Sequence, residues 1–544
     1  MTFRTAATRF GWTMMALASL GAASCVGPGD DLDDPTADPD EIVGANAVAR
    51  RATVQSYVLL PTNASDDAIA RAILTQMRPM FGALKAEDIG LGRRLDASDA
   101  LAQVRAVTEP TWQRDTVDVV DPANPMRPAT QLLRVRFTYT DTAVVPKTQS
   151  ARRAISTTAL FGDYAAHGNE IVQSCQGEHQ DWGASGIWYN FEPRTSACAS
   201  LIGAEATRIS AQRRALSNAD RQVTVDEAAR WFTPISVRLS TVARTETKYP
   251  DYHRLFDDNR LVIGSYFGAD KLDDPNDYGA RNFFAYIQTV LRARPELRVT
   301  ASSPTANLGS VTWRGATLTA TPEQVAGWIV NSTGYPTQVS ATDRAEFRNT
   351  VIRQWRDKLI TFSASASLTE GGRTRDVTLE VRVFYGDEES VGSGAVQRYQ
   401  RAFQEVDVFQ YTGHSHLGAG PLDGRNYAAS SFPNRYQVLM VNSCVSFNYY
   451  NRFFDMHPGG TRNLDTVTNG LPVFLEGSGT SSGRFAVAFL DGRWRSYLDV
   501  LTGMKIDLPW ERGHDANRVA DGESDNEFTP TRNPMTLRVS AATP

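Results

Sequence analysis

Apolar residues in the second half of the chain form short continuous runs that alternate with segments of helical periodicity. Such runs are typical of strands buried on both faces, and their alternation with helices favours a mainly parallel sheet sandwiched by helices. We therefore expect an α/β fold in this half. The pattern predicts strands at 261–267, 377–385, 407–416, 437–444 and 471–475, and helices at 278–292, 344–359 and 396–403, with a further helix opening at Thr321.

Residues 51–247 show a different pattern, which predicts a separate α+β domain before the α/β domain at 258–544. Apolar and charged side chains alternate over one stretch as they do in a strand buried on one face. Thr224 and Glu227 have the chemistry of a capping box at the start of a helix. Strands are predicted at 53–60, 131–139 and 235–242, and a helix at 66–81.

Residues 1–24 have the composition of a secretory signal peptide. Arg4 and Arg9 give it a basic start, and the apolar stretch that follows is too short to span a bilayer. The segment ending at Cys25 resembles a bacterial lipoprotein signal, which implies that the Cys25 thiol carries a lipid. Ordinary cleavage near Ala23 is the alternative. We expect an exported protein of the bacterial cell envelope, in the periplasm or on the cell surface.

The segment 25–50 is acidic and contains seven Asp and Glu residues. Such a composition buries little apolar surface, so we expect an extended tether. No later segment could span a bilayer, which leaves a lipid on Cys25 as the only membrane contact that we expect. The formal net charge of the chain is -5 and no Lys/Arg-rich block is present. This excludes the usual electrostatic signature of a nucleic-acid partner.

Four cysteines occur in the chain. Cys175 and Cys198 are close in sequence, in a region that contains Trp and Tyr, and in an oxidising compartment we expect them to form a disulfide. If Cys25 is lipidated, Cys444 remains as an unpaired thiol. Secreted proteins usually avoid a free thiol unless it reacts, so Cys444 becomes a candidate nucleophile.

Two histidines and Cys444 come at the carboxyl ends of two predicted strands, where reactive groups gather in an open parallel sheet. An imidazole beside a thiol favours the thiolate, which attacks, and the imidazole then protonates the leaving amine. We predict His414 as the base. His416 is the alternative, because in an extended segment both side chains point the same way. Backbone N–H groups at Gly413, Ser415 and Cys444 are candidates for an oxyanion hole.

The sequence Thr-Gly-His-Ser at 412–415, followed by Val-Asn-Ser-Cys-Val-Ser at 441–446, resembles the paired motifs of the caspase-like (clan CD) cysteine peptidases. These include gingipain-, clostripain- and CHAT-type enzymes. The resemblance covers roughly residues 258–497 and implies a caspase-like fold with His414 as base and Cys444 as nucleophile. Ser415 stands where the family usually has Gly, and Asn442 and Ser443 replace the small residues that often precede the Cys.

These residues suggest three alternative functions. The first is a cysteine endopeptidase that hydrolyses a polypeptide substrate without metal or cofactor. The second is a catalytically inactive, peptidase-like surface lipoprotein that acts as a binding module, with Cys444 as an ordinary buried side chain. The third is a metal-dependent hydrolase, in which His414, His416 and Cys444 would hold zinc. Gly418 and Ala419 occupy two positions where a metallo-β-lactamase-like motif has ligands.

Overall fold

The computed structural model describes residues 42–162, 164–177, 180–241, 247–272, 274–306, 308–388, 394–505 and 516–540. All of them belong to one compact unit, residues 38–544. The predicted signal peptide, Cys25 and the predicted tether as far as residue 41 lie outside the described residues.

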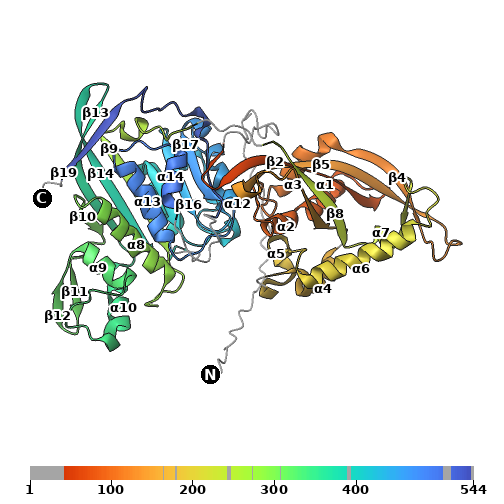
Figure 1. Cartoon of the computed structure of the whole chain (residues 1–544), viewed down its shortest axis with the longest axis horizontal. Helices are drawn as coiled ribbons and strands as arrows, with labels where there is room; N and C mark the ends of the chain where they lie inside the picture. The colour runs from red at the N-terminus through yellow and green to blue at the C-terminus, as the bar shows by residue number, and fades with distance from the viewer. Residues whose placement is uncertain are drawn as a thin grey trace, which may run out of the picture. The chain divides into compact units, whose positions relative to one another are not determined.

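A mixed ten-stranded sheet organises the second half of the described chain (Figure 1). Its five central strands are parallel, and the strands at both edges are antiparallel. All residues of the two strands before the candidate site, β15 and β16, are buried. The order is β1 (Val43–Gly44), β18 (Arg518–Asp521), β17 (Leu464–Asn469), β16 (Gln437–Asn442), β15 (Val408–Thr412), β9 (Arg260–Gly268), β14 (Arg373–Gly386), β13 (Leu359–Glu370) and β10 (Arg298–Ser303), with β19 (Met535–Ser540) paired to β13.

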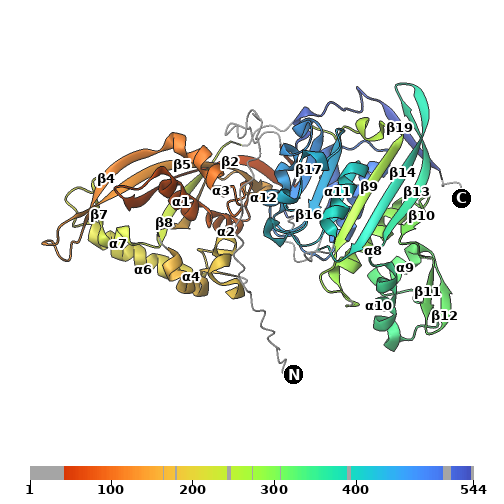
Figure 2. The ribbon, with the colours of Figure 1, turned by 180° about the vertical axis from the view of Figure 1, so that it is seen from behind.

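Helices cover both faces of this sheet (Figures 1 and 2). Successive residues of β9 point to opposite faces, so Leu261 and Ile263 join one hydrophobic cluster while Val262 joins another. The first cluster includes residues of α8 (Tyr278–Ala293), α9 (Pro322–Val330), α10 (Arg344–Trp355), α13 (Ser478–Leu490) and α14 (Tyr497–Met504). The second includes residues of α11 (Ala395–Glu405) and α12 (Ser446–Tyr450). A small hairpin, β11 (Ser310–Trp313) and β12 (Ala316–Thr319), joins the first cluster.

A seven-stranded, mostly antiparallel sheet organises the first half of the described chain (Figure 2). Its order is β6 (Ala154–Leu160), β8 (Phe232–Leu239), β2 (Ala47–Pro61), β5 (Thr130–Pro146), β4 (Gln113–Val120) and β7 (Gln222–Thr224), with β3 (Gly90–Leu91) paired to β5. The helices are α1 (Asp66–Met77), α2 (Met80–Lys85), α3 (Ala100–Thr108), α4 (Gly168–Cys175), α5 (Ile187–Asn190), α6 (Ser196–Arg213) and α7 (Val225–Ala228). This half mixes helices with a largely antiparallel sheet, as an α+β pattern does.

The expectation of an extended tether is wrong for residues 42–50. Residues 43–44 form β1, which pairs with β18 at the edge of the main sheet, and β2 begins at Ala47. Ile42 and Ala47 are buried because this part of the segment is apolar. Arg50 is fully buried as well, and its Nε donates a hydrogen bond to the carbonyl of Ser240 at 2.6 Å. The acidic residues that suggested a tether all precede residue 42.

The predicted strand at 471–475 is a loop, and the strand lies earlier, at β17. β17 was missed because its sequence is rich in polar residues, including Asp465 and Asn469, although every residue in it is buried. Hydrogen bonds to neighbouring elements satisfy these polar side chains, which a hydrophobic pattern does not reveal.

Two predicted helices end earlier than expected. The helix at 66–81 stops at Met77, and Pro79 separates it from α2. The helix at 344–359 stops at Trp355, and Leu359 begins strand β13. Ser and Ala alternate in much of β13, so its apolar periodicity is weak.

Cys175 and Cys198 form a disulfide. Cys175 ends α4 and Cys198 lies in the first turn of α6, so the bond ties these two helices together. Both sulfur-bearing residues are fully buried with Ile171 and Phe191 in a separate hydrophobic cluster.

A buried aspartate, Asp465, lies near the amino end of β17, away from the carboxyl edge where the candidate site residues occur. Its carboxyl accepts hydrogen bonds from the hydroxyl groups of Tyr436 and Tyr497 and from the side-chain amide of Asn526, the last at 2.6 Å. Burial raises the pKa of Asp465 to about 7, although these hydrogen bonds act in the opposite direction. In an unfolded chain the pKa of Asp is about 3.9.

We predict that Asp465→Asn weakens the pH dependence of stability. Because the folded pKa is the higher one, the stabilisation from protonated Asp465 is complete below about pH 4 and is lost as pH rises through about 7. Urea unfolding of the wild type between about pH 5 and 6.5 should therefore show stability falling with pH. The substitution should make this slope shallower by about 1.4 kcal/mol per pH unit. An identical slope in the two proteins would contradict the prediction.

Candidate active site

The strands that precede the candidate residues are direct neighbours. β15 and β16 pair in parallel, and Thr412 lies opposite Asn442 at the end of the register. His414 and Cys444 each follow two residues after this last pair. The sheet therefore brings the two segments to the same edge, although they are far apart in sequence.

His414 contacts a carboxylate that the sequence analysis did not identify. Its Nε2 lies 3.2 Å from Oδ1 of Asp270, and the two side chains are 40% and 30% exposed. Asp270 follows β9, the strand on the other side of β15. The hydroxyl of Tyr411 also donates a hydrogen bond to the carbonyl of His414 at 3.0 Å. The signal that could have revealed Asp270 is its place just after the apolar run at 261–267.

His416 lies in the same loop but in a different environment. Its ring centroid is 6.1 Å from that of His414, and its side chain packs so closely on Gly420 that a Cβ there would lie 2.6 Å from the imidazole. Burial, followed by the charge of His414, lowers the pKa of His416. The His416 ring thus packs on its own loop, and its pKa is shifted in the direction that favours the neutral form.

Cys444 is half-buried, and among the described residues it is the free cysteine. Its thiol donates a hydrogen bond to the carbonyl of Val473, with sulfur and oxygen 3.6 Å apart. Within the described part of the chain, no hydrogen bond joins this thiol to His414 or His416. Burial raises the pKa of the Cys444 thiol, while the positive charge of Lys85 acts to lower it.

Both loops contain residues in the left-handed region of backbone space. Val445, directly after Cys444, has φ 46°, and His416 and Leu417 have φ 49° and 53°. This conformation is a genuine outlier for a β-branched residue such as Val445. Each such residue costs on the order of 1–3 kcal/mol, and these outliers cluster at functional sites. The amide of Val445 donates to the carbonyl of Leu471 at 3.1 Å, which helps to hold the turn.

A buried polar network lies at the strand ends that precede Cys444. The Asn442 side chain accepts hydrogen bonds from Asn469 and Arg518, each at 3.1 Å, and donates to Ser482 at 3.3 Å. Ser482 is also 2.9 Å from the hydroxyl of Thr412, at the end of β15. The network thus joins the ends of β15, β16 and β17. It gives Asn442 a structural role at a position where the resembled family often has a small residue.

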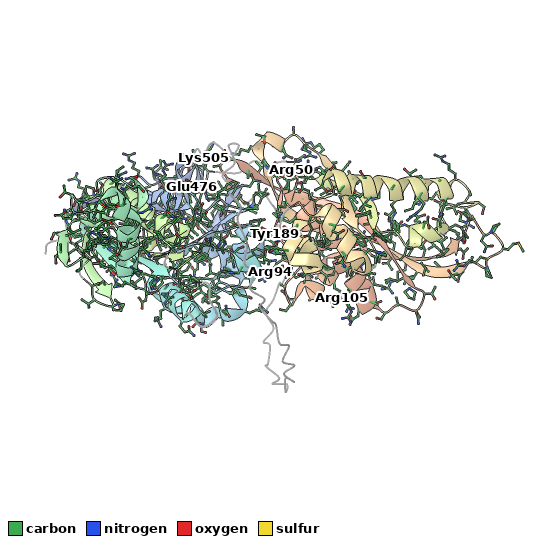
Figure 3. All side chains as sticks on the ribbon, turned by 90° about the horizontal axis from the view of Figure 1, so that it is seen from below. Arg50, Arg94, Arg105, Tyr189, Glu476 and Lys505 are labelled. Carbon is green, nitrogen blue, oxygen red and sulfur yellow. A yellow bond between two sulfur atoms is a disulfide. The ribbon has the colours of Figure 1, made fainter. Side chains whose placement is uncertain are left out.

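The first half of the chain also contributes to this region. The guanidinium of Arg94, labelled in Figure 3, donates to the carbonyl of Leu417 at 3.3 Å and lies 5.4 Å from the ring centroid of Tyr449. The side chain of Asn448 donates to the carbonyls of Leu91 and Arg93 at 3.0 and 2.7 Å. Segment 91–94 therefore holds both the histidine loop and the helix that follows Cys444.

Lys85, at the end of α2, is the second cation from this half. Its ammonium lies 3.7 Å from the ring centroid of Tyr189, which is labelled in Figure 3, and its charge acts on the Cys444 thiol. None of Lys85, Arg94 and Asp270 was found by sequence reasoning. Lys85 ends α2 and Arg94 lies in the loop after β3, both in the first half of the chain, so only the tertiary structure relates them to the site.

The predicted oxyanion residues lie in the histidine loop. Gly413 is buried and packs on Tyr411, and Ser415 is 5% exposed. The carbonyl of Ser415 accepts a hydrogen bond from the hydroxyl of Tyr450 at 2.8 Å. The role of the Gly413 and Ser415 amides stays a prediction.

The described residues contain no group of three or more His, Cys, Asp or Glu side chains arranged to hold a metal ion. His414 instead uses Nε2 for Asp270, and the Cys444 thiol uses the Val473 carbonyl.

Comparison with known proteins gives no match. The comparison found no matching protein-family model, curated protein or solved structure.

We predict that Arg94→Ala loosens both loops of the site. The substitution removes the hydrogen bond to Leu417 and the cation–π contact with Tyr449, so amide hydrogen exchange at residues 416–419 and 447–450 should become at least about tenfold faster. Arg105→Ala is the matched control, because Arg105 pairs with Asp67 and Glu109 instead. Equal exchange rates in these segments for wild type and Arg94→Ala would contradict this role.

We predict that Lys85→Met makes Cys444 less reactive. Loss of the positive charge should raise the thiol pKa further, so less thiolate is present at a given pH. Iodoacetamide labelling of Cys444 at about pH 8, followed by mass spectrometry, should slow about threefold. Lys147→Met, which removes an exposed lysine from the same half, should label as the wild type does. Equal labelling of all three proteins would show that the Lys85 charge does not reach the thiol.

Proposed function

We propose that this chain is an exported cysteine endopeptidase with His414 and Cys444 as its catalytic dyad. The observation that carries the proposal is the parallel pairing of β15 and β16, which directs both residues to one edge of the sheet. The contact between His414 and Asp270 and the left-handed backbone at Val445 support it.

The proposed fold relationship is to the caspase-like peptidases. Support comes from a central block of parallel strands with helices on both faces, and from a histidine and a cysteine that follow adjacent strands. The resemblance in residues 412–415 and 441–446 is the second line of support. Both lines of support come from the second half of the chain.

In the proposed reaction the Cys444 sulfur attacks the carbonyl carbon of a peptide bond. Because Nε2 of His414 is directed at Asp270, we assign Nδ1 as the atom that accepts the thiol proton and later gives it to the leaving amine. A thioester then links the acyl part of the substrate to sulfur, and water hydrolyses it. The thiol must first leave the Val473 carbonyl by rotating about its Cα–Cβ bond.

Asp270 acts as a positioning residue in this scheme. A carboxylate that accepts a hydrogen bond from one imidazole nitrogen holds the ring in one tautomer and stabilises the imidazolium that forms. The backbone amides of Gly413, Ser415 and Cys444 are the proposed donors to the oxyanion.

We further propose that the protein is a lipoprotein of the cell envelope, with a signal peptide at 1–24 and a lipid on Cys25. The disulfide between Cys175 and Cys198 supports an oxidising compartment. Among the described residues, no helix has both the length and the apolar character needed to cross a membrane. The proposed partner is a polypeptide substrate, and no cofactor takes part.

A catalytically inactive, peptidase-like binding protein is the second candidate. The observation that favours it is the Cys444 thiol itself, which is hydrogen-bonded to a carbonyl and has a pKa raised by burial. A thiol in this state is a weak nucleophile until it moves towards the imidazole.

We predict that catalysis depends on His414 and Cys444 and much less on His416. Cleavage of an unfolded protein such as casein should disappear in Cys444→Ala and fall about 10²- to 10⁴-fold in His414→Ala, because base catalysis contributes about that much. His416→Ala should retain activity within about tenfold, since its ring packs inside its own loop. Asp270→Asn should lower kcat more than it changes KM and should alter the pH profile.

The outcomes of these assays distinguish the proposed mechanism from its alternatives. Full activity in Cys444→Ala rules out the proposed mechanism, and equal losses in His414→Ala and His416→Ala would leave the base unassigned to His414. An inert wild-type protein whose Cys444 resists iodoacetamide supports the binding protein instead.

A further inference from the structure

Exposed large hydrophobic side chains concentrate beside the candidate dyad. Among the described residues six such side chains are exposed, and three of them are Leu272, Tyr278 and Phe474, with 44%, 41% and 52% exposure. Single exposed hydrophobic residues are ordinary on a protein surface, but grouped ones mark places where something binds. Leu272 and Phe474 lie in two loops next to the dyad, and Tyr278 is the first residue of α8, which follows the first of these loops.

Each of the two loops contacts one member of the dyad. Asp270, which contacts His414, precedes Leu272 by two residues. Val473, whose carbonyl accepts the Cys444 thiol, directly precedes Phe474. The exposed side chains are therefore close along the backbone to the atoms that hold the imidazole and the sulfur.

Hydrogen bonds of the Asn282 side chain connect α8 to the loop that carries Phe474. The amide nitrogen of Asn282 donates to the carbonyl of Leu475 at 2.8 Å, and the Asn282 side-chain oxygen accepts from the amide of Gly479 at 2.9 Å. Asn282 lies one helical turn after Tyr278, so both face the same side of α8. The start of α8 and the segment around Phe474 are therefore neighbours.

The loop that carries Leu272 is also well anchored. The carboxyl of Asp277 accepts hydrogen bonds from the amides of Lys271 and Ala280 at 2.5 and 2.6 Å, and from the hydroxyl of Tyr385 at 3.0 Å. Asp277 thereby ties the residue before Leu272 to the first turn of α8. Leu272 and Tyr278 are exposed although the backbone that carries them is held in place.

We propose that Phe474, Leu272 and Tyr278 form the subsite that binds a nonpolar side chain of the polypeptide substrate beside the scissile bond. The proposal rests on the proposed peptidase function and names its substrate class. The occupant follows from position: an extended peptide whose carbonyl carbon meets Cys444 must run past the segments on either side of the dyad. Covering these exposed apolar surfaces removes them from water, which favours binding.

An acidic subsite is the competing assignment. Glu476 is exposed two residues after Phe474 and is labelled in Figure 3, and a carboxylate there could pair with a substrate Lys or Arg. Asp270 is already directed at His414. A single exposed carboxylate contributes little as an ion pair in water, whereas three apolar side chains offer a larger surface, so the apolar assignment is favoured.

The test uses the full chain and a peptide library prepared from a denatured proteome, with cleavage sites read by mass spectrometry. Wild type should cleave next to Leu, Phe, Tyr or Met. Phe474→Glu and Leu272→Glu should each lower kcat/KM for the best such peptide at least tenfold. Cys444 should still be labelled by iodoacetamide in both variants, slowed no more than about threefold by the added negative charge, which shows that the thiol stays accessible. Leu498→Glu is the control, because Leu498 is also 44% exposed but lies in α14.

The two hypotheses fail in different ways. Cleavage that needs Cys444 but occurs next to Lys or Arg, or that Phe474→Glu and Leu272→Glu leave unchanged, overturns the apolar subsite while the peptidase function stands. If no cleavage depends on Cys444, the peptidase function itself is wrong, and the subsite falls with it.

Discussion

The parallel pairing of β15 with β16 is the constraint on which the rest of this structure depends. Because Thr412 and Asn442 lie opposite each other, whatever follows the two strands emerges at one edge of the sheet. All residues of both strands are buried, so a shift in their register would disrupt packing on both faces of the sheet. The core thus fixes where the segments that carry His414 and Cys444 leave the sheet.

Buried polar interactions stabilise this edge of the sheet. The network of Asn442, Asn469, Arg518 and Ser482 joins three strands and α13, and its members are fully or almost fully buried. A buried polar group without partners costs about 1–3 kcal/mol, more than the roughly 0.5–1.5 kcal/mol that a satisfied hydrogen bond contributes, so such a network favours one arrangement of the strand ends. Val445, which follows Cys444, has a left-handed backbone, and its amide donates to the carbonyl of Leu471.

The first half of the chain is part of the site's construction. Arg94 holds the histidine loop, Asn448 binds back to segment 91–93, and the charge of Lys85 acts on the thiol. Among the described residues the two sheets also share an edge connection, because β1 leads directly into β2. These contacts help to hold the two loops that carry His414 and Cys444.

The sequence by itself determined the local features whose cause is local. Apolar runs and helical periodicity predicted the mixed α/β character, β9, β15, β16, α8 and α11, and the spacing of Cys175 and Cys198 predicted the disulfide. The same patterns drew attention to His414 and Cys444. Apolar patterning failed at β17, where buried Asp465 and Asn469 read as polar, and at residues 42–50, where an acidic stretch obscured the strands that follow it.

Only the tertiary structure decided which residues surround His414 and Cys444. Asp270, Val473, Lys85 and Arg94 are distant from His414 or Cys444 in sequence, and strand order together with the packing of two sheets relates them. The tertiary structure also separated the two histidines, because three successive left-handed residues, 416–418, turn the chain so that His416 packs into its own loop. In an extended segment, side chains two residues apart point the same way, so the sequence alone does not distinguish the two imidazoles. The turn that separates them is held by contacts with other parts of the chain.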